Sequence, residues 1–498
     1  MTDAIAKPAA AVGTVRPMSA AGAKRIGVIV VAYNAASTLA QVLDRIPPSF
    51  VAKISDVLVC DDASHDATFL VGLGYQQVSE LPLQIIRRER NLGYGGNQKA
   101  AYRWAIEHGL DIVVLLHGDG QYAPEHLEKM VEPLLNGECD AVFGSRMIEK
   151  GAARRGGMPR YKLVGNRILT TVQNAVVGAN LSEWHSGYRA YSVAALQDIP
   201  FERNHDGFDF DTQIIIQLLE AGKRIAEIPI PTYYGDEICY VNGVGYARDV
   251  VADSLRYRAH KIGFGSGDAA FQSRGYEQKI DDVSSHRQIV QWLSTPRPLR
   301  ILDLGCSAGH LAADLRKHGH SVVGVDIESV DGVRDRVDKF VLHDLDTGLG
   351  DAVQGPFDVV LAADVLEHVR APEQLLTDAR RVLAPDGVVV ACVPNFGHWY
   401  ARMRVASGTF AYERRGILDA GHLRFFTRRS FAKMARECDF EIVRRRALGV
   451  PFEVLGRGGR RGALRSLARV ASAVDRVAAA AWPTLFGYQF LVELRPRD

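Results

Sequence analysis

Short runs of β-branched and apolar residues alternate with helical patterns from Arg25 onward. This alternation predicts a parallel β-sheet with crossover helices. The predicted helices are Gly96–His108 and Pro124–Leu135, and the second opens with a proline in the first turn, where proline is tolerated. The predicted strands are Ile26–Ala32, Val57–Asp61, Leu83–Arg87, Ile112–Leu116 and Ala141–Gly144.

A second alternation of the same kind follows later in the chain. Its predicted helices are Leu311–His318 and Pro372–Leu383. Its predicted strands are Arg300–Leu304, Val322–Val325, Phe340–His343, Val359–Ala362 and Val388–Val393. The two sets show no repeat of one another, so the sequence predicts an α/β protein with two tandem Rossmann-like domains.

The segments outside these patterns set the predicted domain limits. The stretch GFGSGDAAFQSRG is rich in Gly and Ser and reads as a linker, placed at residues 263–277. The domains are then residues 25–262 and 278–498. Residues 1–24 are Ala-rich, contain prolines and lack the apolar core of a secretory signal, so we expect a disordered tail.

Composition excludes several classes of protein. The chain has 498 residues, 47% hydrophobic and 24% charged, and a net charge of +2, so no global excess of positive charge favours nucleic acid as a partner. Six cysteines without paired spacing fit neither a disulfide framework nor a zinc site and favour a reducing cytoplasm. No apolar run approaches the roughly 18 residues that span a bilayer.

A basic segment near the C-terminus has two interpretations. Apolar residues recur there at helical spacing among many arginines, including Arg444, Arg457 and Arg469. The segment is either a solvated helix face packed on the second domain or a peripheral contact with an anionic membrane surface.

Three acidic sites follow predicted strands of the first domain. Asp61 and Asp62 stand in VCDDASHDAT, and Asp119 stands in VVLLHGDGQYAPE. Open α/β sheets bind ligands at the carboxyl ends of their strands. Carboxylates there can accept from a base or a sugar hydroxyl, or hold a divalent cation beside a diphosphate. Taken singly, each aspartate is better explained as a turn or cap residue, so the interpretation depends on the set of motifs.

The ordered set of motifs resembles family-two inverting glycosyltransferases of the GT-A fold, in particular the dolichyl-phosphate mannosyltransferase type. The resemblance covers nearly all of the chain from Arg25 to about His260. It rests on YN after the first strand, DDASHD, GDGQ, NLGYGGNQK, GSR, SGYR and FDFDTQI followed by EIPIPTYYGDE.

This resemblance implies a nucleotide-sugar donor and a divalent metal, Mg or Mn. Tyr33, Asn34 and Asp61 or Asp62 would hold the base and ribose. The metal and diphosphate would lie at two further residues, Asp119 and Gln121. Arg189 would meet a donor or acceptor phosphate, where its fork can bind two oxygens. The sequence departs from the family at His117, a substrate-binding candidate that replaces the first carboxylate of the usual Asp-x-Asp.

Asp211 is the candidate catalytic base, because related enzymes place the base before an aligned helix. It could equally cap the helix that begins at this point. A sugar hydroxyl acceptor needs a base, whereas the oxygen of a polyprenyl phosphate is already anionic and needs none. The acceptor remains open between a glycan, a glycolipid and a polyprenyl phosphate.

The second domain contains a glycine-rich turn in RILDLGCSAGHLA. Asp303, Gly305 and Gly309 lie in this strand-to-helix turn, and Asp326 ends the next strand. Glycines let backbone amides approach a ligand, and the second acidic residue can bind ribose hydroxyls. The turn could also open a nicotinamide site, although Ser307 stands where a dinucleotide fingerprint has its second glycine.

The wider set resembles class I S-adenosylmethionine-dependent methyltransferases from about Gln278 to the C-terminus. It consists of DLGCSAGH, GVDIE, LHDLD, FDVVLAADVLEHV and LAPDGVVVACVPN. The resemblance implies S-adenosylmethionine as cofactor. Its methionine end would contact Asp303, Gly305 and Gly309, its ribose Asp326 and its adenine edge Asp344. The methyl-transfer site would be bordered by Ala363, Asp364 and His368, the last of which could also be a satisfied residue at a helix end.

An aromatic and basic stretch follows the fifth strand of the second domain. It reads NFGHWYARMRVASGTFAYERRGILDAGHLRFFT and resembles the acceptor cover of sugar and small-molecule methyltransferases. His422 is the candidate base, with Asp419 as an orienting carboxylate.

The sequence thus predicts a cytoplasmic bifunctional transferase that carries out inverting glycosyl transfer and methyl transfer to a sugar or related hydroxyl. The alternatives are one active domain beside a non-catalytic nucleotide-binding or scaffolding module, a nicotinamide-dependent second domain, and a protein devoted to membrane docking.

Overall fold

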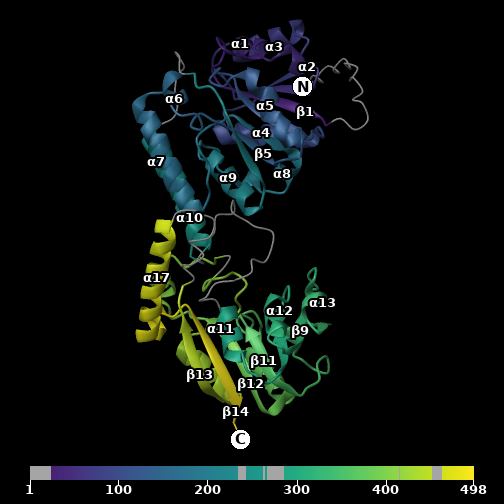
Figure 1. Cartoon of the computed structure of the whole chain (residues 1–498), viewed down its shortest axis with the longest axis vertical. Helices are drawn as coiled ribbons and strands as arrows, with labels where there is room; N and C mark the ends of the chain where they lie inside the picture. The colour runs from purple at the N-terminus through teal and green to yellow at the C-terminus, as the bar shows by residue number, and fades with distance from the viewer. Residues whose placement is uncertain are drawn as a thin grey trace, which may run out of the picture. The chain divides into compact units, whose positions relative to one another are not determined.

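A computed structural model describes residues 24–233, 243–261, 264–265, 285–413, 416–450 and 462–497. The predicted tail, apart from Lys24, and most of the predicted linker lie outside these ranges. Contacts divide the chain into two compact units. The first consists of Met1–Leu163, His185–Asp211 and Gly222–Tyr240, and the second of Val164–Trp184, Thr212–Ala221 and Val241–Asp498. Each unit contains one seven-stranded sheet (Figure 1).

The first sheet is mostly parallel and has the strand order β3-β2-β1-β4-β6-β5-β7. Only β6 runs antiparallel, between β4 and β5. The five strands predicted for this domain are all present, which confirms the α/β fold. The strands are β1 (Ile26–Ala32), β2 (Ile54–Asp61), β3 (Leu83–Arg87), β4 (Ile112–His117), β5 (Ala141–Ser145), β6 (Arg189–Ser192) and β7 (Ile225–Pro229).

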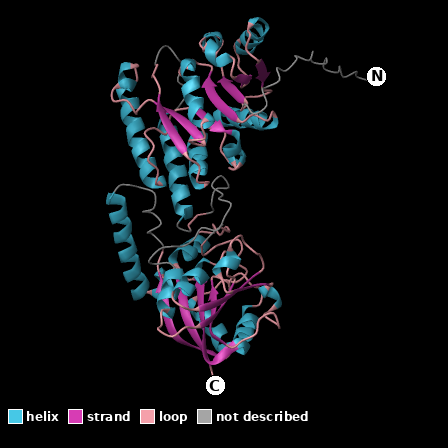
Figure 2. Cartoon of the chain, turned by 45° about the vertical axis from the view of Figure 1, so that its right-hand side comes forward, coloured by secondary structure: helices cyan, strands magenta, loops and turns pink. Residues whose placement is uncertain are grey.

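Helices surround this sheet, as Figure 2 shows. The helix predicted at Gly96 begins earlier, at Gly93, and the proline-led helix begins as a short 3₁₀ turn. The helices from here to residue 261 are α1 (Leu39–Asp44), α2 (Pro48–Val51), α3 (Thr68–Val78), α4 (Gly93–Glu107), η1 (Pro124–His126), α5 (Leu127–Leu135), α6 (Ala152–Arg155), α7 (Arg160–Val177), α8 (Val193–Gln197), η2 (Phe201–Arg203), α9 (Phe210–Glu220) and α10 (Gly243–Lys261).

The core of the first unit lies around β1. All seven residues of β1 are buried, because it pairs with β2 on one side and β4 on the other. Buried residues of α1 and α5 pack against the sheet in the same cluster. The rigid centre of the sheet therefore ends at the loops that carry the predicted site.

The second sheet has the order β10-β9-β8-β11-β12-β14-β13. Its first five strands pair in parallel, and β14 and β13 add an antiparallel edge. The five predicted strands are present. The strands are β8 (Arg300–Leu304), β9 (Ser321–Asp326), β10 (Lys339–Leu342), β11 (Phe357–Ala363), β12 (Leu383–Pro394), β13 (Phe440–Leu448) and β14 (Gln489–Pro496).

Part of the predicted basic segment is a strand. Arg444, Arg445 and Arg446 lie on β13, at the edge of the sheet. Arg444 stacks over the ring of Trp292 at 4.2 Å, and Arg446 donates to Gln288. Charged side chains on an edge strand oppose pairing with another chain, which gives these arginines a structural role.

The helices of this part of the chain include the predicted Leu311–His318 and Pro372–Leu383, each shifted by about a residue at its ends. They are α11 (Ser285–Leu293), α12 (His310–Lys317), α13 (Val333–Arg336), η4 (Leu345–Thr347), α14 (Pro372–Val382), α15 (Trp399–Ala406), α16 (Arg428–Glu437), α17 (Gly462–Ala481) and α18 (Pro483–Phe486). Within the described ranges, none of the helices combines the length and apolar character needed to cross a bilayer.

Two residues of the predicted linker pack on the second domain. The ring of Phe264 lies 4.7 Å from that of Tyr400, and the backbone N–H of Gly265 donates to Glu413 Oε1 at 3.1 Å. At this point the chain is anchored to the acceptor-cover stretch.

Candidate functional site

The carboxyl ends of β1, β2 and β4 meet at one edge of the first sheet. Ala32 pairs with Asp61 in the register of β1 and β2, and Val31 pairs with His117 in the register of β1 and β4. The residues that follow each strand are therefore neighbours in space. The structure brings together the YN, DDASHD and HGDGQ motifs, as the strand-end argument predicts.

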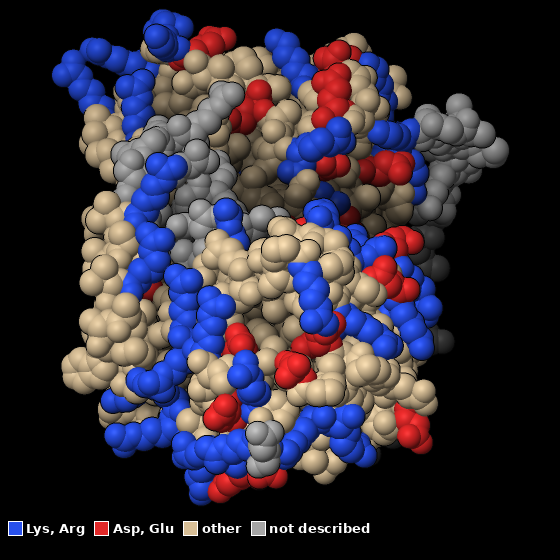
Figure 3. All heavy atoms as spheres, turned by 60° about the horizontal axis from the view of Figure 1, so that its bottom comes forward, with Lys and Arg blue, Asp and Glu red and all other residues tan. Residues whose placement is uncertain are grey.

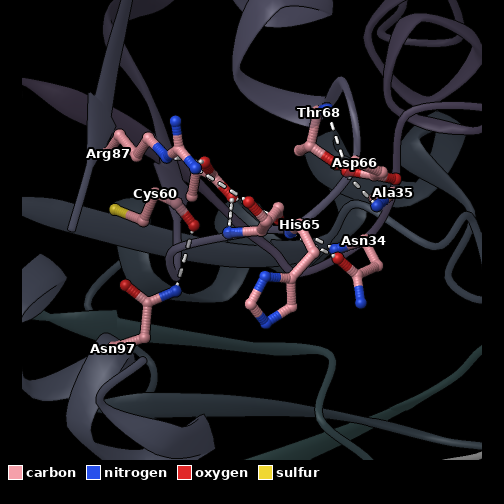
Figure 4. Close-up of polar contacts among 10 residues, drawn as sticks. Asn34, Ala35, Cys60, His65, Asp66, Thr68, Arg87 and Asn97 are labelled. Atoms are coloured by element: carbon pink, nitrogen blue, oxygen red, sulfur yellow. Dashed lines mark hydrogen bonds and ion pairs between the residues drawn. The ribbon is translucent and has the colours of Figure 1, made fainter. Parts of the chain in front are cut away.

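The loop after β1 is locked to the loop after β2 by hydrogen bonds (Figure 4). The backbone N–H of Asn34 donates to Ser64 Oγ at 2.9 Å, and Asn34 Oδ1 accepts from the N–H of His65 at 2.9 Å. Asn34 adopts a left-handed conformation with φ of 51°. Strained backbone of this kind at a strand end is common in binding sites.

Asp61 and Asp62 have different surroundings. Asp61 is fully buried, accepts from Ser64 and lies 3.6 Å from Arg87 Nε. Asp62 accepts from the N–H of Leu92 at 2.8 Å, yet burial raises its pKa. Asp61 therefore shapes the loop, and Asp62 connects it to the NLGYGGNQK segment.

The HGDGQ motif forms a tight turn after β4. Asp119 is exposed, and its Oδ1 accepts from the backbone N–H of Gln121 at 2.9 Å. Gly120 supplies the left-handed position of the turn, with φ of 76°. The carboxylate of Asp119 thus stands at the open edge of the sheet with oxygen lone pairs still available for a cation.

A polar network behind this edge joins four elements. The Tyr94 hydroxyl donates to Asp211 Oδ2 at 3.0 Å and lies 3.5 Å from His117 Nε2. Arg189 is 1% exposed, and its Nη1 lies 3.5 Å from Asp211 Oδ1. Its Nε donates to Ser186 O at 2.8 Å. The structure therefore brings His117, Arg189 and Asp211 together, and Tyr94 is the residue that sequence reasoning missed.

Burial and charge set the protonation states in this network. Burial lowers the pKa of His117, which favours a neutral imidazole. Burial and the negative charge of Asp211 raise the pKa of Tyr94 well above its usual value. Burial alone would lower the pKa of Arg189, but Asp211 and neighbouring tyrosines raise it. The network is thus a neutral histidine, a protonated phenol and a buried guanidinium.

Gly187 of the SGYR motif is required by close packing. A Cβ there would lie 2.7 Å from His117 Cε1 and Nε2 and 2.8 Å from the Tyr94 hydroxyl. The N–H of Gly187 also donates to the Tyr122 hydroxyl at 2.7 Å. The SGYR motif was therefore visible in the sequence, but the contact between its glycine and His117 could not be predicted from the spacing of the motifs.

The glycine-rich turn of the second unit follows β8. Gly305, Ser307 and Gly309 all have positive φ values, 65°, 48° and 72°. The N–H of Ser307 donates to Asp326 Oδ2 at 2.7 Å, which ties the turn to the end of β9. A Cβ on Gly305 would lie 2.7 Å from the Val365 side chain.

A small cleft opens beside this turn. Asp303 lies within it, 3% exposed, and burial together with the nearby charge of Asp326 raises its pKa to about 7. The lining includes the predicted Asp303, Gly305 and Ala363, and His286 and His310, which sequence reasoning missed. The other lining residues are Cys306, Ser307, Ala308 and Leu311.

Two predicted cofactor residues have local structural partners. Asp344 is exposed and accepts from the N–H of Asp346 at 2.9 Å, so it caps η4. Asp364 has a φ of 58° and accepts from Gln489 Nε2 at 2.7 Å. Their contacts with a cofactor stay predictions.

His422 and His368 face one another in the acceptor-cover region. Their ring centroids are 4.8 Å apart, and each directs Nδ1 to a backbone carbonyl, of Ile417 at 3.3 Å and of Gly421 at 2.9 Å. A carbonyl can only accept, so each Nδ1 carries the proton and Nε2 is the acceptor nitrogen. Burial lowers the pKa of His422. Asp419 accepts from the N–H of Gly421 at 2.7 Å.

These histidines also form a grouping suited to a metal ion. One ligand atom each from Glu367, His368 and His422 lies within 4.8 Å of the other two. Acidic groups commonly stand together without a metal, so the grouping alone assigns no ion.

Two family models match the chain. The model described as glycosyl transferase family 2 matches residues 27–199, and the model described as methyltransferase domain matches residues 276–445. The first match covers β1 to β6 apart from Ile26, and the second covers β8 to β12 and the start of β13.

Curated relatives align with the first match. The undecaprenyl-phosphate mannosyltransferase of Micrococcus luteus is 30% identical over 208 residues, 41% of this chain and 82% of its own length. The dolichyl-phosphate N-acetylglucosaminyltransferase of Methanococcus voltae, which uses UDP-N-acetylglucosamine, is 27% identical over 42% of this chain and 86% of its own. The polyprenol monophosphomannose synthase of Mycolicibacterium smegmatis is 26% identical over 44% and 78%.

Solved structures resemble each half. Glucosyl-3-phosphoglycerate synthase from Mycobacterium tuberculosis, with Mn²⁺ and uridine diphosphate, is 20% identical over 47% of this chain and 80% of its own, with a TM-score of 0.36. The 1,6-didemethyltoxoflavin-N1-methyltransferase from Burkholderia thailandensis is 19% identical over 44% and 80%, with a TM-score of 0.29. From the sequence matches, the chain belongs to glycosyltransferase family 2 and carries a methyltransferase domain behind its glycosyltransferase domain, so it is a fused transferase enzyme.

Proposed function

We propose that the first domain transfers a sugar from a nucleotide-sugar donor to a polyprenyl phosphate, with inversion at the anomeric carbon. The observation that carries this proposal is the meeting of Asn34, Asp62 and Asp119 at the carboxyl edge of the first sheet. The names of the relatives support the acceptor, because two are named for undecaprenyl or dolichyl phosphate and the third for the synthesis of polyprenol monophosphomannose.

The nucleoside binds at the loops after β1 and β2. Tyr33 and Asn34 lie on one loop, and the hydrogen bonds to Ser64 and His65 hold it against the other. Asp61 or Asp62 then accepts from a base or a ribose hydroxyl. The loops are fixed before the donor arrives, so less ordering entropy opposes binding.

A divalent cation, Mg²⁺ or Mn²⁺, fits beside Asp119 and Gln121. Magnesium in such sites uses one or two carboxylates together with substrate phosphates, and Asp119 offers an exposed carboxylate at the right edge. The cation supplies positive charge that stabilises the leaving diphosphate. The neutral His117 stands where the family usually has the first carboxylate of the Asp-x-Asp motif. We place it beside the bound donor, at the carboxyl end of β4.

The acceptor phosphate oxygen attacks the anomeric carbon as the bond to the diphosphate breaks. No base is required, because the oxygen is already anionic. Asp211 accordingly acts as a positioning residue, held by Tyr94 and by Arg189. The buried guanidinium neutralises Asp211 and keeps the SGYR segment in place.

For the second domain we infer methyl transfer from S-adenosylmethionine to a sugar hydroxyl or a related hydroxyl. The left-handed turn fits the cofactor because Gly305 lines the cleft without a side chain, and Gly309 adopts the left-handed backbone that ends the turn. Asp303 would hold the methionine end, Asp326 the ribose and Asp344 the adenine edge, while Ala363 and Asp364 would border the reacting methyl group.

His422 is the proposed base of methyl transfer. Its Nδ1 proton is directed to Ile417 O, so Nε2 has the lone pair that can take a proton from the acceptor hydroxyl. Burial lowers its pKa, which keeps the ring neutral near pH 7. The cofactor supplies the methyl group, and the protein orients the hydroxyl in line with it.

A membrane-bound acceptor requires the enzyme to reach a bilayer surface. A peripheral contact through the basic C-terminal segment, at the cytoplasmic face, therefore forms part of the proposal.

The test of the glycosyl-transfer proposal uses the purified full chain with labelled nucleotide sugars, polyprenyl phosphate and Mn²⁺. We expect a labelled lipid product that needs the metal, and its loss in Asp119→Asn. The matched control is Asp351→Asn, an exposed carboxylate of the second domain that should leave transfer unchanged. Absence of product with every nucleotide sugar, from protein that still methylates, would contradict the proposal.

A further inference from the structure

Over residues 469–481, helix α17 (Gly462–Ala481) presents a row of valines to solvent. Val470, Val474 and Val477 are 60%, 63% and 70% exposed. Their spacing of four and three residues places them on one face of the helix. Ala473, Ala480 and Ala481 are also exposed and continue the same face. We call these six residues the valine face.

Over the same residues, the opposite side of α17 packs on the protein and includes the polar residues Ser472 and Asp475. Ser472 and Ala479 are each 1% exposed. Asp475 Oδ2 accepts from the N–H of Val450 at 2.7 Å, and burial raises the pKa of Asp475. A helix of a globular domain normally buries its apolar stripe. Here the valines face solvent instead, which indicates that the valine face binds a partner.

The charges beside the valine face are positive. Arg469 and Arg476 are exposed and lie one above the other, two turns apart, along the same border of the face. The one acidic residue between Arg469 and Ala481, Asp475, points to the protein. In Figure 3 the left edge of the molecule, where Figure 1 places α17, shows uncharged surface bordered by basic side chains. Apolar residues bordered by arginines complement an anionic lipid surface.

The size of the valine face favours lipid over protein. From Val470 to Ala481 the helix rises about 17 Å at 1.5 Å per residue. A stripe of that length, no wider than the helix diameter of about 10 Å, covers roughly 170 Å². That is far below the roughly 800 Å² per partner of a stable protein interface. An interfacial helix needs only to lay such a stripe among headgroups and upper acyl chains. Trp482, 58% exposed, follows the helix, and tryptophan is favoured at membrane interfaces.

We propose that the valine face of α17 docks the enzyme on an anionic phospholipid bilayer, with Arg469 and Arg476 at the headgroups. This inference rests on the proposed function in one respect: a polyprenyl phosphate acceptor lies in such a bilayer. It assigns the contact to one helix face rather than to the whole basic segment.

The test is flotation of the full chain with vesicles. One set contains phosphatidylcholine with phosphatidylglycerol, and the other contains phosphatidylcholine alone. We expect the wild type to float with the anionic vesicles and to be released several-fold by raised salt. The variant Val470→Ser/Val474→Ser/Val477→Ser should lose at least tenfold in vesicle affinity, and Arg469→Gln/Arg476→Gln should lose the preference for anionic lipid.

A matched control separates the valine face from general surface hydrophobicity. Val78, Val330 and Val405 are also exposed but lie outside α17. Their joint replacement by serine should leave flotation unchanged, while circular dichroism and the melting temperature confirm that both triple variants fold.

Three outcomes would overturn the inference. The first is equal flotation of the α17 triple variant and the wild type. The second is a dimer by light scattering that only the α17 variant loses, which would assign the face to a second copy. The third is a monomer that does not float with vesicles and whose valine face is protected in hydrogen exchange. That result would mean that another part of this chain covers the valine face. Flotation needs no substrate, so inactive protein that still binds vesicles would overturn the glycosyl-transfer proposal and leave this one standing.

Discussion

The hydroxyl of Tyr94 donates a hydrogen bond to Asp211 Oδ2 across 3.0 Å. The two residues come from the start of α4 and the start of α9, more than a hundred positions apart in the chain. The loop before α9 is held against α4 by the N–H of Gly95, which donates to Asp206 O at 2.8 Å. Tyr94 of the NLGYGGNQK motif thus holds the carboxylate of Asp211, the residue that the family resemblance named as the candidate base.

Tyr94→Phe should weaken glycosyl transfer without abolishing it. The substitution keeps the ring but removes the donor to a buried carboxylate, a hydrogen bond worth about 1–3 kcal/mol. If that energy positions Asp211, kcat should fall about tenfold, since about 1.4 kcal/mol corresponds to a factor of ten. KM for the donor should change less, as steady-state kinetics would show.

The control for this prediction is Tyr161→Phe, because Tyr161 is 73% exposed. It should match the wild type in rate and melting temperature. An unchanged kcat in Tyr94→Phe would mean that the Tyr94 hydroxyl has no part in positioning Asp211.

Gly187→Ala should damage the glycosyltransferase site through crowding. The added methyl group would lie 2.7 Å from His117 and 2.8 Å from the Tyr94 hydroxyl, so one of them must move. Overpacking of this kind costs about 1–3 kcal/mol. We expect a lower melting temperature and slower sugar transfer, while methyl transfer persists.

Gly165→Ala is the matched control. Gly165 lies inside α7, and a Cβ there would meet no atom within 4 Å. Alanine should stabilise this helix by about 0.5–1 kcal/mol. Equal effects of the two substitutions on sugar transfer would rule out the steric explanation.

The stability of the second domain should fall as the pH rises toward 7. Asp303 has a folded pKa of about 7 against an ordinary value of 3.8, because it is buried near Asp326. Between these pH values the folded state holds a proton that the unfolded state has released. The carboxyl therefore destabilises the fold increasingly from about pH 4 to pH 7, at up to about 1.4 kcal/mol per pH unit.

Urea denaturation from pH 4.5 to 7.5 checks this prediction. Asp303→Asn should remove the contribution of Asp303 to the fall of unfolding free energy with pH. The contribution of Asp475, whose pKa burial raises to about 6, should remain. Parallel pH profiles for the variant and the wild type would show that Asp303 titrates normally. S-adenosylhomocysteine, with its cationic ammonium, should bind more tightly as Asp303 ionises.

His422→Gln should slow methyl transfer while cofactor affinity stays the same. Glutamine retains a polar side chain but cannot take a proton, so kcat should drop by about 10²-fold or more. Turnover and S-adenosylhomocysteine titration measure the two effects. His318→Gln, an exposed histidine of α12's end, serves as the control. Undiminished turnover in His422→Gln would remove His422 from the mechanism.

The elements with strong local patterns were predictable from the sequence. The central strands β1 and β8 were predicted at their observed limits, since a strand buried between two neighbours needs a continuous apolar run. Four strands were missed: β6, β7, β13 and β14. Four residues of RAYS and the arginines of β13 carry no such run. Their pairing partners, rather than their own residues, make them strands.

The motifs likewise named the candidate residues of both sites. The order of YN, DDASHD and HGDGQ along the chain indicated a site at the strand ends, because parallel strands deliver their carboxyl ends to one edge. The turn with Gly305 and Gly309 was recognisable because left-handed backbone favours glycine.

Only the tertiary structure decided which of these residues touch. The contact of Tyr94 with Asp211, the space that Gly187 leaves for His117 and the outward turn of the valines on α17 depend on how distant segments pack. Periodicity fixes which residues share a helix face, but it does not say which face meets the protein. That choice is made by long-range packing and by single hydrogen bonds such as that of Asp475 with Val450.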